Sequence, residues 1–327
     1  MASWFEAPLW KMRIYASLRE EVDPSTDRHY FRQRSVGYTG DLSFWKTPSP
    51  EPELAPLLIE RLSMPLAPDD SICLAASTLA ARIKSYFDPQ QTLFVAILRA
   101  GVPLAAWLRK MLPGAEAVAT SLFVGLGIDQ TALAAIRADY PDRKIVFVDG
   151  WTGKGGVANE LRRLEAGPLA VLSDPWGQAE FRGTRDDIFS PSACFTGPTT
   201  LGFSRTFHSD DNKPFAAYRF PDELLQASFV ESWLASCPET REDTLQDKSE
   251  FRIKHESPLR LHSNEVCRAL INSNPETLLF AESDSIVRAK YEFLLALAEA
   301  QKVPQRFNVS ELDELNAQVA CTLRLSC

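Results

Sequence analysis

The chain has 327 residues and a formal net charge of −8, and hydrophobic residues make up 45% of it. This composition is typical of a soluble globular protein and excludes a disordered chain. The negative charge argues against a protein whose main surface coats long nucleic acid. The length exceeds that of one ordinary core and predicts two domains.

The beginning of the chain, MASWFEAPLWKMRIY, lacks the basic segment, apolar segment and cleavage site of a secretory signal. No apolar run reaches the roughly 18 residues that a membrane span needs, so we expect none. The six cysteines are scattered without a CxxC pair, which favours neither a disulfide framework nor a zinc site. Together these observations predict a cytoplasmic location.

Residues 1–90 are rich in Pro and aromatic residues, and we expect a loop-rich extension packed on the core, with a helix over 71–86. From Thr92, apolar runs of strand length alternate with helical patterns. The strands are TLFVAIL, AVATSLFV, KIVFVD and LAVLSD, and the helices are VPLAAWLRKML, DQTALAAIRADY and VANELRRLEA. This alternation predicts an α/β domain over 91–236, with a parallel sheet flanked by helices and a ligand site at the carboxyl ends of the strands.

Residues 175–215 are polar and irregular, and we expect them to form a cap over the sheet. A closing helix, PDELLQASFVESWLA, is followed by a polar linker over 237–258. Residues 259–327 alternate again and predict a second, small α/β domain. It begins with a helix capped by Ser263, continues with the strand TLLFAE and the long helix SDSIVRAKYEFLLALAEAQ, and ends with the strands RFNVS and VACTLRL around a short helix.

The stretch VFVDGWTGKGGV joins an apolar strand to a glycine-rich turn. Its spacing fits neither a Walker A loop nor a GxGxxG fingerprint. Backbone N–H groups at a helix N-terminus, with the Thr152 hydroxyl and the Lys154 charge, suit a monophosphate, and Asp149 suits sugar hydroxyls. A tight turn with a solvated lysine is the plainer alternative. The residues expected to bind the phosphate are Gly150, Trp151, Thr152, Gly153, Lys154, Gly155 and Gly156.

A second loop, ILRAGVP, places Arg99, Ala100 and Gly101 directly after the first strand of the domain. Arg99 can hold two phosphate oxygens, and the neighbouring amides can close on a pyrophosphate. Together the two loops resemble those of type I phosphoribosyltransferases. The resemblance implies that the LRAG loop binds the pyrophosphate and the later loop the ribose 5-phosphate of phosphoribosyl pyrophosphate. The single acid, Asp149, stands where that family usually has two, and Gly155 replaces the final Thr of its TGxT motif.

A longer resemblance rests on GIDQTALAAI, KIVFVDGWTGKG, LAVLSDP, IFSPSAC and SRT, which occur in this order between Gly127 and Thr206. They are similar to the phosphoribosyltransferase family encoded in bacterial tellurite-resistance and stress operons, some members of which carry the label cysteine protease StiP. The segment SNEVCRALINSNPETLLFAE resembles a Pelota-like, ribosomal-protein-L7Ae-like domain. The resemblance implies production or salvage of a nucleoside-like metabolite, and an RNA or protein partner for residues 259–327.

We therefore expect Mg²⁺-dependent phosphoribosyl transfer from phosphoribosyl pyrophosphate to a nucleobase-like acceptor. Asp149 and Arg99 are the expected catalytic residues, and Asp149 is also the expected metal ligand. Residues expected to face the substrate are Asp174, Cys194, Ser204 and Arg205. The sequence leaves the oligomeric state open.

Two other functions remain open at this point. One is a non-catalytic sensor that binds a nucleotide and signals through residues 259–327. The other is a cysteine peptidase with Cys194 as nucleophile and His208 as base, for which a cysteine packed in the cap is the simpler interpretation. Asp129 is expected to cap the helix that begins at residue 130.

Overall fold

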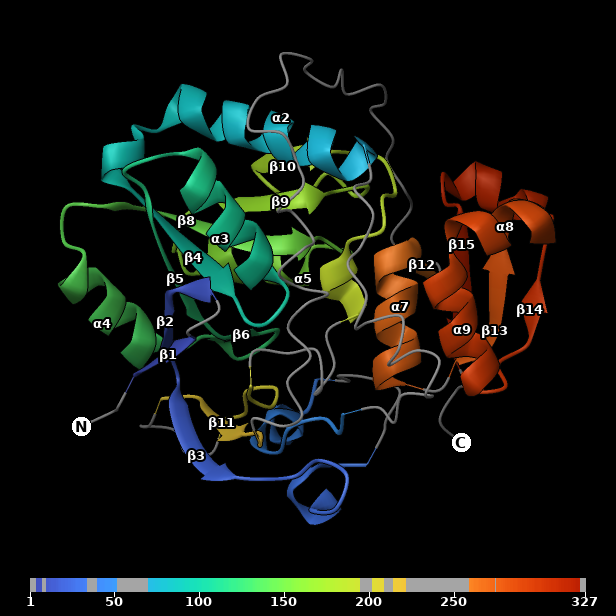
Figure 1. Cartoon of the computed structure of the whole chain (residues 1–327), viewed down its shortest axis with the longest axis horizontal. Helices are drawn as coiled ribbons and strands as arrows, with labels where there is room; N and C mark the ends of the chain where they lie inside the picture. The colour runs from blue at the N-terminus through green and yellow to red at the C-terminus, as the bar shows by residue number, and fades with distance from the viewer. Residues whose placement is uncertain are drawn as a thin grey trace.

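A computed structural model describes the chain at residues 4–7, 10–33, 40–51, 70–194, 202–208, 214–221, 259–273 and 275–323. The closing helix expected after Pro221 and the linker expected over 237–258 lie outside these residues. Figure 1 shows a large α/β unit and, beside it, a smaller unit built from the C-terminal residues.

A seven-stranded sheet forms the centre of the large unit, in the order β1-β2-β5-β4-β8-β9-β10. Only β1 runs antiparallel to its neighbour, and the other pairs are parallel. The strands are β1 (Phe5–Ala7), β2 (Met12–Tyr15), β4 (Thr92–Ile97), β5 (Glu116–Thr120), β8 (Lys144–Trp151), β9 (Leu169–Ser173) and β10 (Phe181–Thr184). This architecture confirms the predicted α/β class with a mostly parallel sheet.

Helices cover both faces of this sheet, which explains why its strands are apolar at successive positions. On one face, Phe94 and Val146 share a core with α2 (Asp70–Tyr86) and α3 (Gly101–Met111). Their chain neighbours Val95 and Phe147 point to the other face. There they pack with the helices α4 (Gln130–Asp139) and α5 (Gly156–Arg163).

Two regions expected to lie outside the sheet contribute strands to it. The N-terminal residues supply β1 and β2, and the expected cap supplies β10, which pairs with β9. A separate two-stranded sheet joins β3 (Ser17–Glu21) to β11 (Ala216–Arg219). The predictions of a loop-rich extension and of an irregular cap are therefore wrong at these positions, because strands of three to five residues are too short to show a clear periodicity.

Two local predictions are confirmed, one for a helix and one for a helix cap. The helix expected over 71–86 is α2, one residue longer. Asp129 caps α4 as expected, because its carboxylate accepts a hydrogen bond from the N–H of Ala132 at 2.9 Å.

The C-terminal unit has its own four-stranded sheet, in the order β12-β15-β13-β14. Its elements are β12 (Arg260–Leu261), α7 (Ser263–Asn272), β13 (Pro275–Phe280), α8 (Asp284–Lys290), α9 (Glu292–Ala300), β14 (Gln305–Arg306), η8 (Ser310–Leu315) and β15 (Val319–Leu323). In Figure 1 this unit is orange to red, and α7 contacts the large unit at the short helix η5 (Pro191–Cys194).

Two details of this unit differ from the prediction. Ser263 is the first helical residue rather than the cap, and its N–H and hydroxyl both donate to the Asp187 carboxylate, at 2.9 and 2.7 Å. A residue of the large unit thus caps α7. The predicted long helix is divided at Tyr291, whose ring is buried against Phe280.

Cys73 is disulfide-bonded, although the cysteine spacing in the sequence does not favour a disulfide framework. Cys267 and Cys321 are free and buried. Within the described residues, no helix combines the length and the apolar character required to cross a membrane.

Candidate functional site

The candidate site lies where β8 ends and the glycine-rich turn begins, beside η5 and α7. A hydrogen bond from Thr152 fixes the turn to the residue that follows β9. The Thr152 hydroxyl donates to the buried Asp174 carboxylate at 2.5 Å, and Asp174 also accepts the N–H groups of Gln178 and Ala179, each at 2.9 Å. Both predicted ligand-binding groups, Thr152 and Asp174, are thus engaged in holding two turns together.

Protein atoms cover the backbone of this turn. A β-carbon at Gly153 would lie 2.8 Å from the carboxyl carbon of Glu265, and one at Gly150 would lie 2.6 Å from Ser192 Oγ. Gly155 has φ of +96° just before α5, which favours glycine. The groups that face the turn therefore include a carboxylate of α7.

Glu265 is fixed over the turn by two partners. Trp151 Nε1 donates to Glu265 Oε1 at 2.8 Å, and the Arg260 guanidinium lies 3.7 Å from its other oxygen. Lys154 lies with its amine 5.8 Å from the centroid of the Trp176 ring, and burial lowers the pKa of this amine, as does the nearby charge of Arg260. The turn that was expected to bind a phosphate is therefore covered by the carboxylate of Glu265.

Asp149, at the end of β8, has the most strongly shifted carboxyl group of the site. Burial raises its pKa to about 7, and the charge of Glu265 adds to the shift. The N–H of Gly150, which donates to the carboxylate at 2.7 Å, and the charge of Arg268 act in the opposite direction. A carboxyl group with this pKa changes its protonation state near neutral pH.

We expect Asp149→Asn to stabilise the chain in a pH-dependent way. Between pH 4 and 7 the folded chain keeps a proton that the unfolded chain releases, so Asp149 lowers the free energy of unfolding as the pH rises through this window. At pH 8 the free energy of unfolding of the variant should exceed that of the wild type by about 2 kcal/mol. This is less than the full pKa shift of Asp149 implies, because the side chain is only partly buried. Below pH 4 the two should be equal.

Urea unfolding of both proteins from pH 4 to 8 measures this difference. The exposed Asp142→Asn serves as the control, with no pH-dependent difference expected. A constant difference between Asp149→Asn and the wild type over the whole range would contradict the assignment.

Arg99, expected to hold a pyrophosphate, has a partner within the chain. Its Nη1 lies 2.8 Å from Glu51 Oε1 and 3.1 Å from the carbonyl of Phe203, and its Nη2 lies 3.4 Å from Glu51 Oε2. Both side chains of the ion pair are nearly inaccessible, at 4% and 2% exposed. The guanidinium that was expected to take two phosphate oxygens takes the two oxygens of Glu51. The next residues, Ala100 and Gly101, begin α3, which packs against the end of β8.

The remaining predicted residues divide into two groups. Ser204 holds the backbone, since its hydroxyl donates to the carbonyl of Arg205 and accepts the N–H of Tyr218. Arg205 lines a cavity, described below. Cys194 closes η5, and the side chain of this cysteine lies outside the described part of the structure. His208 packs its ring edge-on against Phe215, with 5.3 Å between the ring centroids.

Among the described residues, no three His, Cys, Asp or Glu side chains come together in a way that could hold a metal ion. Asp149, the expected magnesium ligand, therefore belongs to no such group of three among these residues. The magnesium expectation stays a prediction from the resemblance.

A sequence profile of a family described as "Tellurite-like stress resistance cysteine protease StiP" matches residues 33–235. The chain belongs to the StiP family. The protein named "Cysteine protease StiP" from Acinetobacter baylyi is 39% identical over 121 residues, which cover 33% of this chain and 31% of that protein. The match thus spans about a third of this StiP relative. The crystal structure of a hypoxanthine-guanine phosphoribosyltransferase from Bacillus anthracis covers 39% of this chain and 78% of its own, with 12% identity and a TM-score of 0.26, too low to carry an argument.

Membership of the StiP family corrects the expected function. The family and the relative are both described as cysteine proteases, so the expectation of a phosphoribosyltransferase that uses phosphoribosyl pyrophosphate is wrong. The stress and tellurite-resistance part of the expectation agrees with the family description.

Sequence reasoning missed several charged residues of the site, among them Arg32, Glu51, Glu265 and Arg268. Arg32 and Glu51 lie in no motif, and the segment that contains Glu265 and Arg268 was expected to form a separate domain. They come from the N-terminal segment and from α7, far from the two loops in the sequence, and only the folded chain brings them to the strand ends.

Proposed function

We propose that the chain hydrolyses peptide bonds with Cys194 as its nucleophile. The family description supports this proposal, because the matched span 33–235 contains two cysteines, Cys73 and Cys194. Cys73 is 2% exposed, so its sulfur lacks the access that such a reaction needs. Cys194 is the remaining candidate.

The surroundings of η5 favour a thiolate. Arg268 Nη1 donates to the carbonyl of Ala193, the residue before Cys194, at 3.1 Å. Arg205 lies close enough to Arg268 for the two charges to interact. Positive charges near a cysteine lower the pKa of its thiol and raise the thiolate fraction.

Asp149 is the group that we propose as the base. Its carboxyl group has a pKa of about 7, which suits proton transfer near neutral pH. It also lies beside η5, since a β-carbon on the next residue, Gly150, would be 2.6 Å from Ser192 Oγ. His208 suits the role less well, because its ring is packed against Phe215 and it is not among the residues that line the neighbouring cavity.

In the proposed reaction the thiolate sulfur bonds to the scissile carbonyl carbon, and the amine leaves with a proton. Water then attacks the thioester, releases the acid and restores the thiol. The proton taken from the thiol passes through Asp149 to the leaving amine.

Cleavage of a mixture of fluorogenic peptides, in buffer with a thiol reductant, tests the proposal. The wild type should cleave at least one peptide and lose this activity on alkylation with iodoacetamide. Cys194→Ala should be inactive. Cys267→Ala should keep most of the activity, because the Cys267 thiol is buried, 3.6 Å from the carbonyl of Ala193 in η5. Equal cleavage by the wild type and Cys194→Ala would refute the role of Cys194.

The Pelota/L7Ae-like resemblance of residues 259–327 stays a prediction, and with it the RNA or protein partner. The unit supports the proposed peptidase site in one specific way, since α7 supplies the Arg268 contact to η5.

A further inference from the structure

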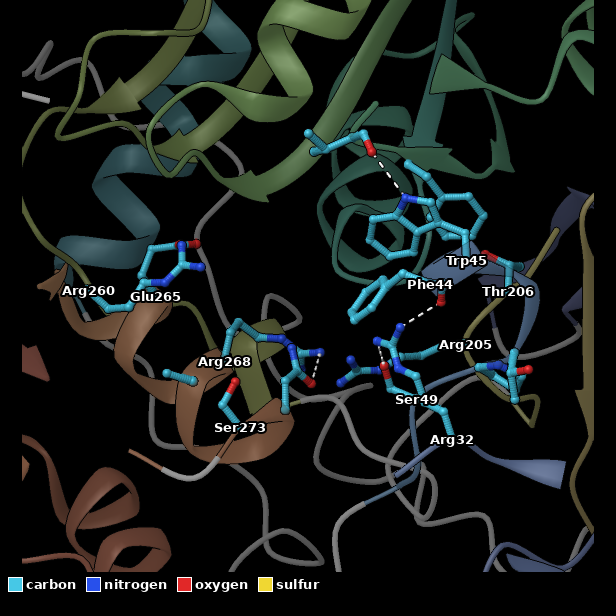
Figure 2. A pocket seen from close by; sticks show the side chains of 16 residues that line it. Arg32, Phe44, Trp45, Ser49, Arg205, Thr206, Arg260, Glu265, Arg268 and Ser273 are labelled. Carbon is cyan, nitrogen blue, oxygen red and sulfur yellow. Dashed lines mark hydrogen bonds and ion pairs between the residues drawn. The ribbon is translucent and has the colours of Figure 1, made fainter. Parts of the chain in front are cut away.

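A cavity of about 390 Å³ lies between the two units, next to η5. One wall is formed by α7, with Arg268, and the opposite wall by η3 (Leu42–Lys46), with Phe44 and Trp45. Arg32 and Arg205 complete the lining. Figure 2 shows the guanidinium groups of these arginines turned toward the same part of the cavity. The volume suits a small organic ligand.

The cavity is positively charged although the chain is acidic. Its lining includes four arginines and one carboxylate, which gives 4 − 1 = +3, whereas the whole chain carries −8. The one carboxylate, Glu265, already accepts a hydrogen bond from Trp151 and lies 3.7 Å from Arg260. Such a local excess of positive charge favours an anionic ligand.

Arg205 lacks the acceptors that the neighbouring arginines have. Arg32 donates to the Phe44 carbonyl and to Ser49 Oγ, and Arg268 donates to the Ala193 carbonyl. In contrast, Nε and Nη2 of Arg205 are buried and have no hydrogen-bond partner in the part of the chain that the structure describes. Burial lowers the pKa of this guanidinium, and the charges of Arg268 and Arg99 lower it further. Leaving such donors unsatisfied is unfavourable, and an anion would satisfy them.

The opposite wall presents flat aromatic surfaces. Trp45 stacks on Phe123 with 4.6 Å between the centroids and an interplanar angle of 14°, and Trp45 Nε1 donates to the Val124 carbonyl at 3.1 Å. These contacts fix the indole in the wall of the cavity. A flat apolar group can pack here while its charged end reaches the arginines.

We propose that this cavity binds a small organic oxyanion, a phosphate or a carboxylate carried on a flat apolar group, with Arg205 as its principal anchor. Arg205 donates two parallel hydrogen bonds to the oxyanion, and Arg32 and Arg268 add charge. The site shares Arg205 and Arg268 with the surroundings proposed for the Cys194 thiolate, but its occupation is measured without any peptide cleavage.

Isothermal titration calorimetry at low salt with four probes tests the site. Phenyl phosphate and phenylacetate represent the two oxyanions, inorganic phosphate lacks the flat group, and benzyl alcohol lacks the charge. We expect at least one aromatic anion to bind, and the tighter one identifies the oxyanion that the site prefers. Inorganic phosphate should bind at least about tenfold more weakly, and benzyl alcohol should give no heat.

Arg205→Met should weaken binding of the preferred probe by at least about tenfold, because it removes the charged donors. It should also unfold at a higher temperature than the wild type without ligand, since a buried unpaired charge is lost. Arg288→Met is the matched control, because Arg288 is an exposed arginine on α8, and it should bind like the wild type. Arg268→Met, on α7, gives a second test and should weaken binding of the preferred probe by less than Arg205→Met does.

Failure of both aromatic anions to bind the wild type would overturn the proposal, and so would equal binding by the wild type and Arg205→Met. Either result leaves the peptidase proposal untouched, because that proposal depends on Cys194.

Discussion

Glu51→Ala is expected to lower the free energy of unfolding by about 3–5 kcal/mol. The substitution leaves the Arg99 guanidinium buried, at 4% exposed, without the carboxylate that now lies 2.8 Å away. The single remaining acceptor that the structure places on it, the Phe203 carbonyl, cannot balance the charge. Urea unfolding monitored by circular dichroism measures the change.

Two controls separate the buried charge from simple loss of side-chain packing. Combining Glu51→Leu with Arg99→Met removes both charges and should recover most of the stability, because apolar side chains of similar size can replace a buried ion pair. Glu6→Ala breaks an exposed pair with Arg13 and should change stability by less than about 1 kcal/mol. If Glu51→Ala and Glu6→Ala cost the same, Glu51 is not needed to balance the buried charge of Arg99.

Gly101→Ala is expected to destabilise the chain by at least about 3 kcal/mol. A β-carbon at this first residue of α3 would lie 2.1 Å from the carbonyl oxygen of Val148 and 2.9 Å from its carbonyl carbon. Both are backbone atoms of the central strand β8, so relief requires a shift of the helix or of the strand. Thermal unfolding of the variant measures the loss.

Gly156→Ala is the matched control, because Gly156 is likewise the first residue of a helix, α5. There the new β-carbon would meet Val124 Cγ2 at 2.9 Å, a side-chain atom that can move. We expect a cost of about 1 kcal/mol or less. Similar losses for both glycine variants would show that α3 can move away from β8 more easily than the close approach at Gly101 indicates.

The four central strands, β5, β4, β8 and β9, could be predicted because each is covered on both faces. Thr92–Ile97 is buried at every position, and an unbroken apolar run of this length is typical of a strand inside a parallel sheet. The edge strands β1 and β10 are shorter and carry polar residues, so their sequences resemble loops. Their pairing depends on neighbours that are distant in the sequence.

The interpretation of the glycine-rich turn failed for a related reason. Glycines and a lysine at a helix N-terminus look the same whether they face a phosphate or a carboxylate of the chain. Here Glu265, more than a hundred residues further along, lies over Gly153. Likewise, nothing in the Pro-rich segment around Glu51 indicates that it pairs with Arg99. The sequence revealed which loops reach the strand ends, but not which side chains meet them there.

The helix α7 follows the span that defines the family, which ends at residue 235. It nevertheless supplies Arg268 and Glu265, one side of the enclosure around the strand ends. Residues outside this span therefore set part of the charge around the strand ends of the sheet that lies within it.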